Sequence, residues 1–427
     1  MKKFYLIVLA AILCLTLAMP AMAKVRVGGI VVFDAVWTNW DQDFMRNKTT
    51  LYGPPNLDSE VDRFHMDNTF GNRLFVKFTG PKGNVGGHME WRLLSEGTFT
   101  KNAASLQEGL QTAFAYGWWQ INPTFKLTAG QQNELISGLD TYNYNGSDVW
   151  AAAAHGGFGN IGQNRIPGVR LDAKITDSVT LSVAASELLT RGGLNKSVPP
   201  PPFTSIWGTN EEDSSMPRFD IQVAFKLGPI TFLPSYMSHT IEWKRDLNSA
   251  AASVGWDTEV DTWAFSIPAK ASFGPFNFAA EYNTGENLED SNIGAGGASG
   301  APMALNTVFD MAGAAEWGVA APAVIGKVYD TDYDGWWAYV EYKFSRAVSA
   351  KFLYGEEQVE NNMPGSEFKY DRDGIMLSLS WVPAPVFKIT PFYGIYDLGT
   401  MNGVGSPKPG LEFGEVTQVG VNFFIVF

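Results

Sequence analysis

Three aspartates in the second half of the chain follow a spacing that is typical of calcium-binding loops. Asp330, Asp332 and Asp334 alternate with other residues, a glycine follows the third of them, and Glu341 completes the pattern. Carboxylate oxygens are the ligands that Ca²⁺ prefers, and the final Glu must fold back onto the ion. However, the segment 335–344 alternates between apolar and polar residues, and a strand would carry Glu341 roughly 23 Å away from the aspartates. We favour the strand, which leaves a solvated acidic loop or a weak surface-bound Ca²⁺ at the three aspartates.

Motifs for catalysis give little support to an enzyme. The segment 157–162 (GFGNIG) has the spacing of a dinucleotide-binding loop, but Pro167 follows too closely for the helix that such a loop requires. The four histidines are scattered without metal-ligand spacing, and there is no G-x-S-x-G nucleophile motif. A catalytic pair that the fold assembles from distant residues stays open as the weaker alternative.

Strands are the elements that must position these residues. In the segment 218–227, Phe219, Ile221 and Phe225 alternate with polar residues, and similar alternation recurs along the chain. Short turns rich in Gly, Pro, Asn or Asp are predicted at Gly80–Asn84, Ile121–Thr124, Thr176–Ser178, Leu227–Ile230, Phe273–Phe276, Ser345–Val348 and Val382–Val386. Long polar connections lie near residues 38–63, 95–112, 135–166, 190–216, 244–258, 286–332, 361–367 and 400–413. Seven turns and eight long connections divide the chain into sixteen strands.

Each strand has one apolar face and one polar face, as a membrane barrel with a water-filled interior requires. We therefore predict an all-β fold, a transmembrane antiparallel β-barrel of 16 strands. A soluble sandwich or propeller is the alternative, but the chain lacks a blade repeat. Aromatic residues at strand ends, which are typical of interfacial girdles, are Trp37, Trp40, Trp118, Trp119, Trp381 and Phe387.

The first residues predict export. A basic start, an apolar segment and Ala21-Met22-Ala23 are typical of a secretory signal peptide, so residues 1–23 would be cleaved and 24–427 would form a single barrel domain. The one cysteine, Cys14, lies within the signal peptide, which excludes thiol chemistry from the mature protein. A formal net charge of −13 argues against nucleic acid as a partner.

The last residues also alternate, and their apolar face carries Val419, Val421, Phe423, Ile425 and Phe427. This segment resembles the closing strand of Gram-negative outer-membrane β-barrels, whose assembly machinery reads a terminal Phe with apolar residues at alternate positions before it. By this resemblance Phe423, Ile425 and Phe427 are the closure and assembly signal, and the barrel assembly machinery is a partner. The protein would lie in the cell outer membrane, in contact with its lipid.

The whole pattern resembles the sixteen-stranded general porins, which are trimeric. The resemblance implies a homotrimer with short periplasmic turns and long extracellular loops. It also implies that a loop at about 135–167 folds into the barrel as a constriction, where Asp140, Asp148 and His155 would lie.

Six basic residues have positions on the polar faces of the early strands, where a charge facing lipid would cost ~2–4 kcal/mol. They would form a basic wall inside the barrel, opposite the acidic loop: Arg73, Lys77, Arg92, Lys126, Arg170 and Lys174. A role in selectivity and simple pairing with neighbouring carboxylates are both open. We expect a porin that admits ions and small hydrophilic solutes by passive diffusion, without a cofactor. The alternatives are a substrate-specific outer-membrane channel and, less favoured, an outer-membrane barrel enzyme.

Overall fold

The structure is a computed structural model. It describes residues 24–41, 60–67, 72–94, 109–136, 138–139, 159, 161, 165–187, 211–212, 216–245, 256–288, 308–312, 324–361, 368–403, 411–412 and 414–427. The predicted signal peptide lies outside these residues. The regular elements among them are β-strands, and none of the described residues forms a helix long and apolar enough to cross a membrane.

The strands of the first half run antiparallel to their neighbours. They are β1 (Lys24–Trp40), β2 (Val61–Asp67), β3 (Arg73–Thr79), β4 (Val85–Leu94), β5 (Gly109–Gln120), β6 (Phe125–Asn133), β7 (Arg165–Lys174), β8 (Val179–Ser186), β9 (Glu211–Glu212), β10 (Arg218–Leu227), β11 (Ile230–Phe232) and β12 (Ser235–Arg245). Two of these, β11 and β12, are parts of one strand that Pro234 interrupts, since proline has no N–H to donate to the ladder.

The second half continues the same sheet. Its strands are β13 (Trp256–Phe273), β14 (Phe276–Glu286), β17 (Thr331–Lys343), β18 (Val348–Asn361), β19 (Phe368–Ala384), β20 (Phe387–Gly403), β21 (Leu411–Glu412) and β22 (Glu415–Val426). A separate hairpin is formed by β15 (Val308–Ala312) and β16 (Val324–Tyr329). With its interrupted strands joined, the sheet is a closed antiparallel barrel of 16 strands, as predicted.

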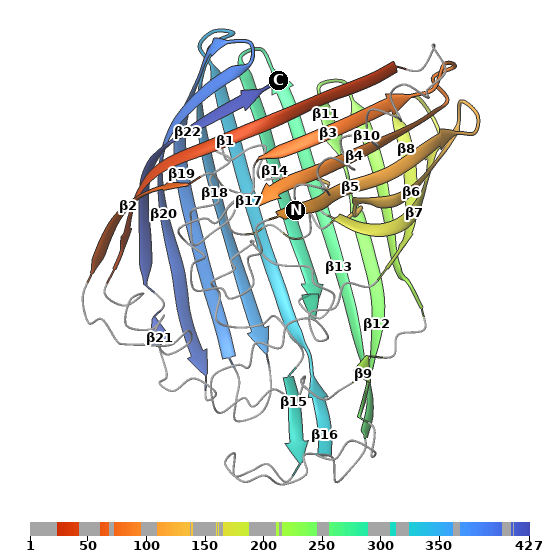
Figure 1. Cartoon of the computed structure of the whole chain (residues 1–427). Coiled ribbons are helices and arrows are strands. Elements are labelled where there is room, and N and C mark those ends of the chain that lie inside the picture. Colours follow the sequence, from red (N-terminus) through yellow and green to blue (C-terminus); the bar gives the residue numbers. More distant parts are fainter. Residues whose placement is uncertain are drawn as a thin grey trace.

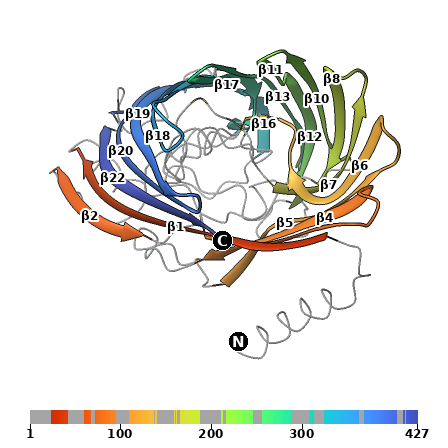
Figure 2. The same cartoon turned by 90° about the horizontal axis from the view of Figure 1, so that it is seen from above.

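Closure occurs between the first and last strands. β1 pairs with β22 from Ile30 opposite Val426 to Trp40 opposite Val416. The other edge of β1 pairs with β3 and, further along, with β2. Figure 2 shows the described strands as a ring, with β1 and β22 side by side. Pairing both edges of β1 satisfies the backbone groups that an open sheet would leave exposed.

All seven predicted short turns join consecutive strands. They lie at 80–84, 121–124, 175–178, 228–229, 274–275, 344–347 and 385–386. Two of them are Gly-Pro pairs, in which Gly228 and Gly274 have φ of 61° and 56°. A positive φ at the first central residue is the geometry of the type II′ turn, which suits the twist of a hairpin. In Figure 1 the turns β17–β18 and β19–β20 lie at the top, and the β15–β16 hairpin lies at the opposite end.

The two faces of the barrel wall differ in chemistry. On β10, Phe219 and Ile221 are 50% and 42% exposed, whereas Arg218, Asp220 and Gln222 are buried. The exposed apolar face is the one that lipid would cover, and the other face lines the interior.

Aromatic side chains form two bands on the outer face. Trp336 belongs to the band nearer the long connections and Tyr342 to the band nearer the short turns, and roughly 20 Å of strand separates them. This spacing suits the apolar band of a membrane barrel, and aromatic girdles mark both of its borders. The girdle prediction was wrong for two tryptophans. Trp40 is buried on the inner face of β1, and Trp118 lies inside against Lys126, because the alternation within β1 and β5 turns both side chains inward.

Candidate pore and its inner wall

The six predicted basic residues lie on four strands of one side of the barrel. Arg73 and Lys77 are on β3, Arg92 on β4, Lys126 on β6, and Arg170 and Lys174 on β7. Their neighbours on the exposed apolar face, such as Leu74, Met89 and Val169, point outward, so alternation directs the cations inward. Strand β5 lies between the two groups and contributes aromatic rings to the same inner face.

Glu90 is the counter-charge of the group on β3 and β4. Its carboxylate lies 3.6 Å from the guanidinium of Arg73 and 3.5 Å from Nε2 of His88. The His88 ring stacks on Phe114 of β5 at 5.1 Å between centroids, and the guanidinium of Arg165 lies 4.7 Å above the same Phe114 ring. This part of the wall is therefore a mixed layer of charged groups and aromatic rings.

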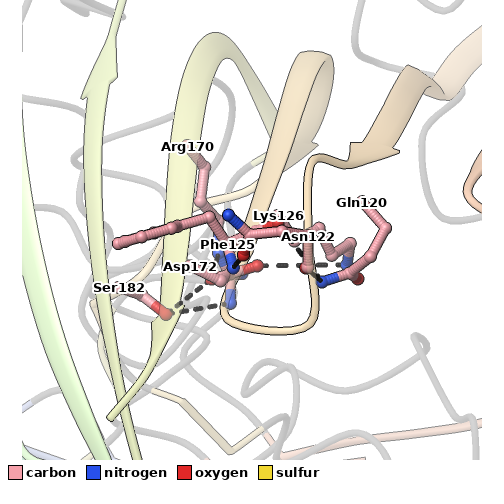
Figure 3. A network of polar contacts seen from close by, with 7 residues as sticks. All are labelled: Gln120, Asn122, Phe125, Lys126, Arg170, Asp172 and Ser182. Carbon is pink, nitrogen blue, oxygen red and sulfur yellow. Dashed lines mark hydrogen bonds and ion pairs between the residues drawn. The ribbon is translucent and has the colours of Figure 1, made fainter.

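Asp172 has the same role in the group on β6 and β7 (Figure 3). Its Oδ1 accepts hydrogen bonds from Nε of Arg170 and from the Ser182 hydroxyl, both at 2.6 Å. The ammonium of Lys126 lies 3.9 Å from Oδ2 of the same carboxylate. Directly below, the β5–β6 turn is held by Asn122, whose Oδ1 accepts the backbone N–H groups of Thr124 and Phe125. The turn fixes where Lys126 enters the wall.

Lys174 lies at the rim of the barrel. Its ammonium contacts Oδ1 of Asp177 at 2.6 Å, in the turn that follows β7. The hydrogen bond from Lys174 lowers the pKa of Asp177, whose side chain is exposed outside the membrane-spanning strands. Carboxylate partners are therefore present for Arg73, Lys126, Arg170 and Lys174.

The residues predicted for the constriction, Asp140, Asp148 and His155, lie outside the described residues. The start of their segment is described and is attached to β10. Arg218 donates from Nη1 to Glu134 at 2.7 Å and from Nη2 to Asp220 at 2.7 Å, with all three side chains buried. Gln222 donates from Nε2 to the backbone carbonyl of Leu135 at 2.8 Å. The chain therefore leaves β6 along the inner face of β10.

Gly159, later in the same segment, contacts a different part of the wall. Its backbone N–H donates to Oε2 of Glu357 on β18 at 2.9 Å, and its carbonyl accepts from Nδ2 of Asn283 on β14 at 2.8 Å. Glu357 also accepts from the hydroxyl of Tyr333 and from Arg372. Gly159 has φ of +79°, and a Cβ there would lie 2.1 Å from the carbonyl oxygen of Trp336. The glycine-rich stretch that has dinucleotide-loop spacing thus supplies a residue whose backbone packs against the wall.

Apolar side chains hold the segment between these two attachments. Leu139 is buried in a cluster with inward-facing residues of β1, β14 and β17–β20, and Leu233 packs against it. The strand residues of the cluster are Val36, Ala279, Trp337, Tyr339, Leu353, Met376 and Phe392. The sequence pattern predicts a wet interior, and this side of it is instead partly apolar.

The calcium pattern is distributed over a strand, as favoured. Asp330 accepts a hydrogen bond from Asn287 and Asp334 accepts one from the Tyr282 hydroxyl. Glu341 lies on the inner face and accepts from Asn277. Among the residues that the structure describes, no group of three or more His, Cys, Asp or Glu side chains could hold a metal. Calcium binding at Asp330, Asp332 and Asp334 stays a prediction.

Comparison with known proteins gives matches among solved structures. The outer membrane channel DcaP of Acinetobacter baumannii superposes with a TM-score of 0.63 at 14% identity, covering 95% of this chain and 98% of that one. The anion-selective porin from Comamonas acidovorans superposes with a TM-score of 0.54 at 12% identity, covering 95% and 100%. This chain has a porin-like fold.

Salmonella typhi OmpF, solved in complex with daunomycin, also has this fold, with a TM-score of 0.52 at 11% identity and coverage of 95% of this chain and 98% of that one. No family model and no curated protein matches the chain. The porin-like barrel, its outward apolar band and its outer-membrane neighbours agree on a location in the outer membrane. Identities this low carry the fold and leave the solute to be argued from the residues of this chain.

Proposed function

We propose that the protein is an outer-membrane porin, a water-filled pore for passive diffusion of ions and small hydrophilic solutes. The observation that supports this best is the attachment of the segment after β6 to two parts of the inner wall, by Arg218 on one side and by Glu357 on the other. A segment held at two points against the inner wall would narrow the pore. Passage through the narrowed pore would need no cofactor and no covalent step. Passage would follow the gradient of the solute.

Selectivity would arise where the narrowed interior carries opposite charges. Asp140 and Asp148 would charge the constriction from the loop, where His155 would also lie. The facing wall would be the cationic groups of β3, β4, β6 and β7, moderated by their partners Glu90 and Asp172. Water-filled interiors lined by rings of charge select ions by these fields.

Assembly follows from the same resemblance. The protein would be exported by the signal peptide of residues 1–23, folded by the barrel assembly machinery through Phe423, Ile425 and Phe427, and assembled as a homotrimer. The pairing of β22 with β1 supports this role of the last strand, because Gly29 and Phe427 exchange backbone hydrogen bonds of 3.0 and 3.1 Å.

Single-channel recording in planar lipid bilayers tests the proposal. We expect conductance of nanosiemens scale in steps of three for a trimer. The pore would be refuted by a folded barrel that carries no current. Resistance to unfolding in detergent at room temperature would show that the barrel is folded.

A substrate-specific channel is the second candidate, and the stacking of His88, Phe114 and Arg165 favours it. The aromatic ring offers a planar solute a stacking surface, and the guanidinium beside it can donate hydrogen bonds to an anionic group. Saturable inhibition of the ion current by one class of solute would distinguish this candidate, whereas a general porin would show current that rises in proportion to salt.

A further inference from the structure

Two adjoining pockets lie at the short-turn end of the barrel, on the side away from the predicted basic wall. The first has a volume of about 410 Å³ and is lined by residues of β13, β14, β17 and β18 together with the turn between β10 and β11. The second has a volume of about 360 Å³ and lies between the β17–β18 turn and the start of β20. Glu341 and Lys351 line both, so the two pockets form one region, which we name the mouth pocket.

The charge of the mouth pocket is strongly positive. Its ionisable lining residues are Lys270, Lys343, Arg346, Lys351, Lys388 and Glu341. Five cations and one carboxylate give a formal charge of +4, whereas the whole chain has a net charge of −13. So much positive charge in one concave region attracts anions and raises their local concentration.

The single carboxylate does not offset this charge. Oε2 of Glu341 accepts a hydrogen bond of 2.5 Å from Nδ2 of Asn277 and lies 3.9 Å from the ammonium of Lys343. Lys351 lies opposite Glu341 in the pairing of β17 with β18, so this carboxylate has two lysines beside it at the boundary of the two pockets. The other three cations of the pocket exceed the charge that one carboxylate can balance.

The uncharged lining also suits an oxyanion. Ser272, Ser345, Ser349 and Ser380 contribute hydroxyl groups to the two pockets, and Thr231 contributes a fifth. Hydroxyl and ammonium groups both donate hydrogen bonds, and phosphate or carboxylate oxygens accept several at once. Lys388 packs 4.8 Å above the Phe424 ring, which holds its ammonium beside the pocket.

We propose that the mouth pocket is a binding site for small multivalent oxyanions, where they are collected at the short-turn mouth before or after passage. The inference rests on the proposed pore and names the class of solute that the pore favours. Binding at such an open site is electrostatic, so it weakens as salt shortens the Debye length from about 10 Å at 0.1 M to about 3 Å at 1 M.

The test uses inorganic pyrophosphate as the probe and the full-length mature protein in planar bilayers. In 0.1 M KCl, pyrophosphate added on the short-turn side should reduce the chloride current of the wild type, and 1 M KCl should abolish the effect. In K351Q/K388Q the half-blocking concentration should rise about tenfold. K369Q/K82Q loses the same charge outside the pocket, at the long-loop end and in the β3–β4 turn, and should behave as the wild type.

Two measurements keep the inference separate from the proposed pore. Isothermal titration of detergent-folded protein with pyrophosphate measures binding without conduction. If the wild type binds pyrophosphate, K351Q/K388Q does not bind it, and the wild type carries no current, the result would refute the pore alone. A conducting pore with equal block in the wild type and K351Q/K388Q would overturn the mouth pocket alone. The single variant R346Q, in an exposed turn, should show a smaller change in the same direction and guards against misfolding of the double variant.

Discussion

The backbone N–H of Gly159 donates a hydrogen bond of 2.9 Å to Oε2 of Glu357, although the two residues are 198 positions apart in the chain. Glu357 is buried, and its carboxylate also accepts hydrogen bonds from Tyr333 and Arg372. Three donor groups therefore surround this carboxylate. The arrangement fixes a point of the segment after β6 against β17 and β18. The properties of the proposed pore depend on this attachment.

Replacing Gly159 by alanine should release the segment while the barrel stays folded. The new Cβ would clash with the Trp336 carbonyl, and the left-handed φ of +79° adds strain of about 1–2 kcal/mol. We expect noisier single channels with a different conductance. Gly83→Ala is the matched control, since Gly83 has φ of +69° and nothing within 4 Å of the added Cβ. Equal conductance in wild type and G159A would show that the attachment does not shape the pore.

Replacing Arg218 by methionine should destabilise the protein strongly. Glu134 and Asp220 would stay buried without their cation, and breaking a buried pair in this way costs about 3–5 kcal/mol. Glu134→Gln keeps a hydrogen-bond acceptor for the guanidinium and should cost less. Urea-induced unfolding in detergent, followed by tryptophan fluorescence, measures both. An R218M protein as stable as E134Q would contradict this account of the pair.

Replacing Asp172 by asparagine should make the pore more selective for anions. The change removes the one carboxylate that both Arg170 and Lys126 contact, so the positive potential of the wall rises. The reversal potential in a KCl gradient measures the shift. Asp177→Asn removes the same charge from an exposed turn and should shift the potential much less.

Neutralising Asp140 and Asp148 together should also move the reversal potential towards anions, because these carboxylates are predicted to face the basic wall. Asp371→Asn, which removes a charge that contacts Lys369 at the long-loop end, is the control. An unchanged potential in D140N/D148N would exclude both residues from the constriction.

Asp177 provides a pH dependence whose sign is set by its lowered pKa. Because Lys174 stabilises the charged carboxylate in the folded state, this pair contributes stability above the pKa of the unfolded chain. The contribution is lost as pH falls through the folded pKa, and it is small because the carboxylate is fully solvated. NMR titration of the Asp177 carboxyl should give a midpoint below that of an unpaired aspartate, and in Lys174→Ala the midpoint should return to the ordinary value.

Sequence periodicity accounted for the strands and hairpins of the barrel because alternation and turn residues are local signals. Alternation assigned the faces of β10 and β17, and Gly228-Pro229 and Gly274-Pro275 predicted two of the hairpins. The girdle prediction considered only closeness to a strand end, and it misplaced Trp40 and Trp118. Both tryptophans are aromatic residues near an end, but their parity turns them inward.

For the stretch around Gly159, spacing in the sequence suggested only a dinucleotide-binding loop, and the nearby Pro167 argued against that loop. No signal within that stretch points to Glu357, since a backbone contact depends on the shape of the opposite wall. Trp337 and Leu353 show a similar limit, because inward parity alone does not reveal that Leu139 covers them.

The sequence by itself determined the sixteen strands, the turns between them and which side chains face inward, because each depends on neighbours a few residues apart. Only the tertiary structure decided which inward side chains meet. Closure of the barrel brings Lys270 of β13 and Lys388 of β20 to one mouth, and it brings Arg218 to Glu134. These meetings depend on strand register and curvature summed around the whole ring, and no local pattern in the chain records that sum.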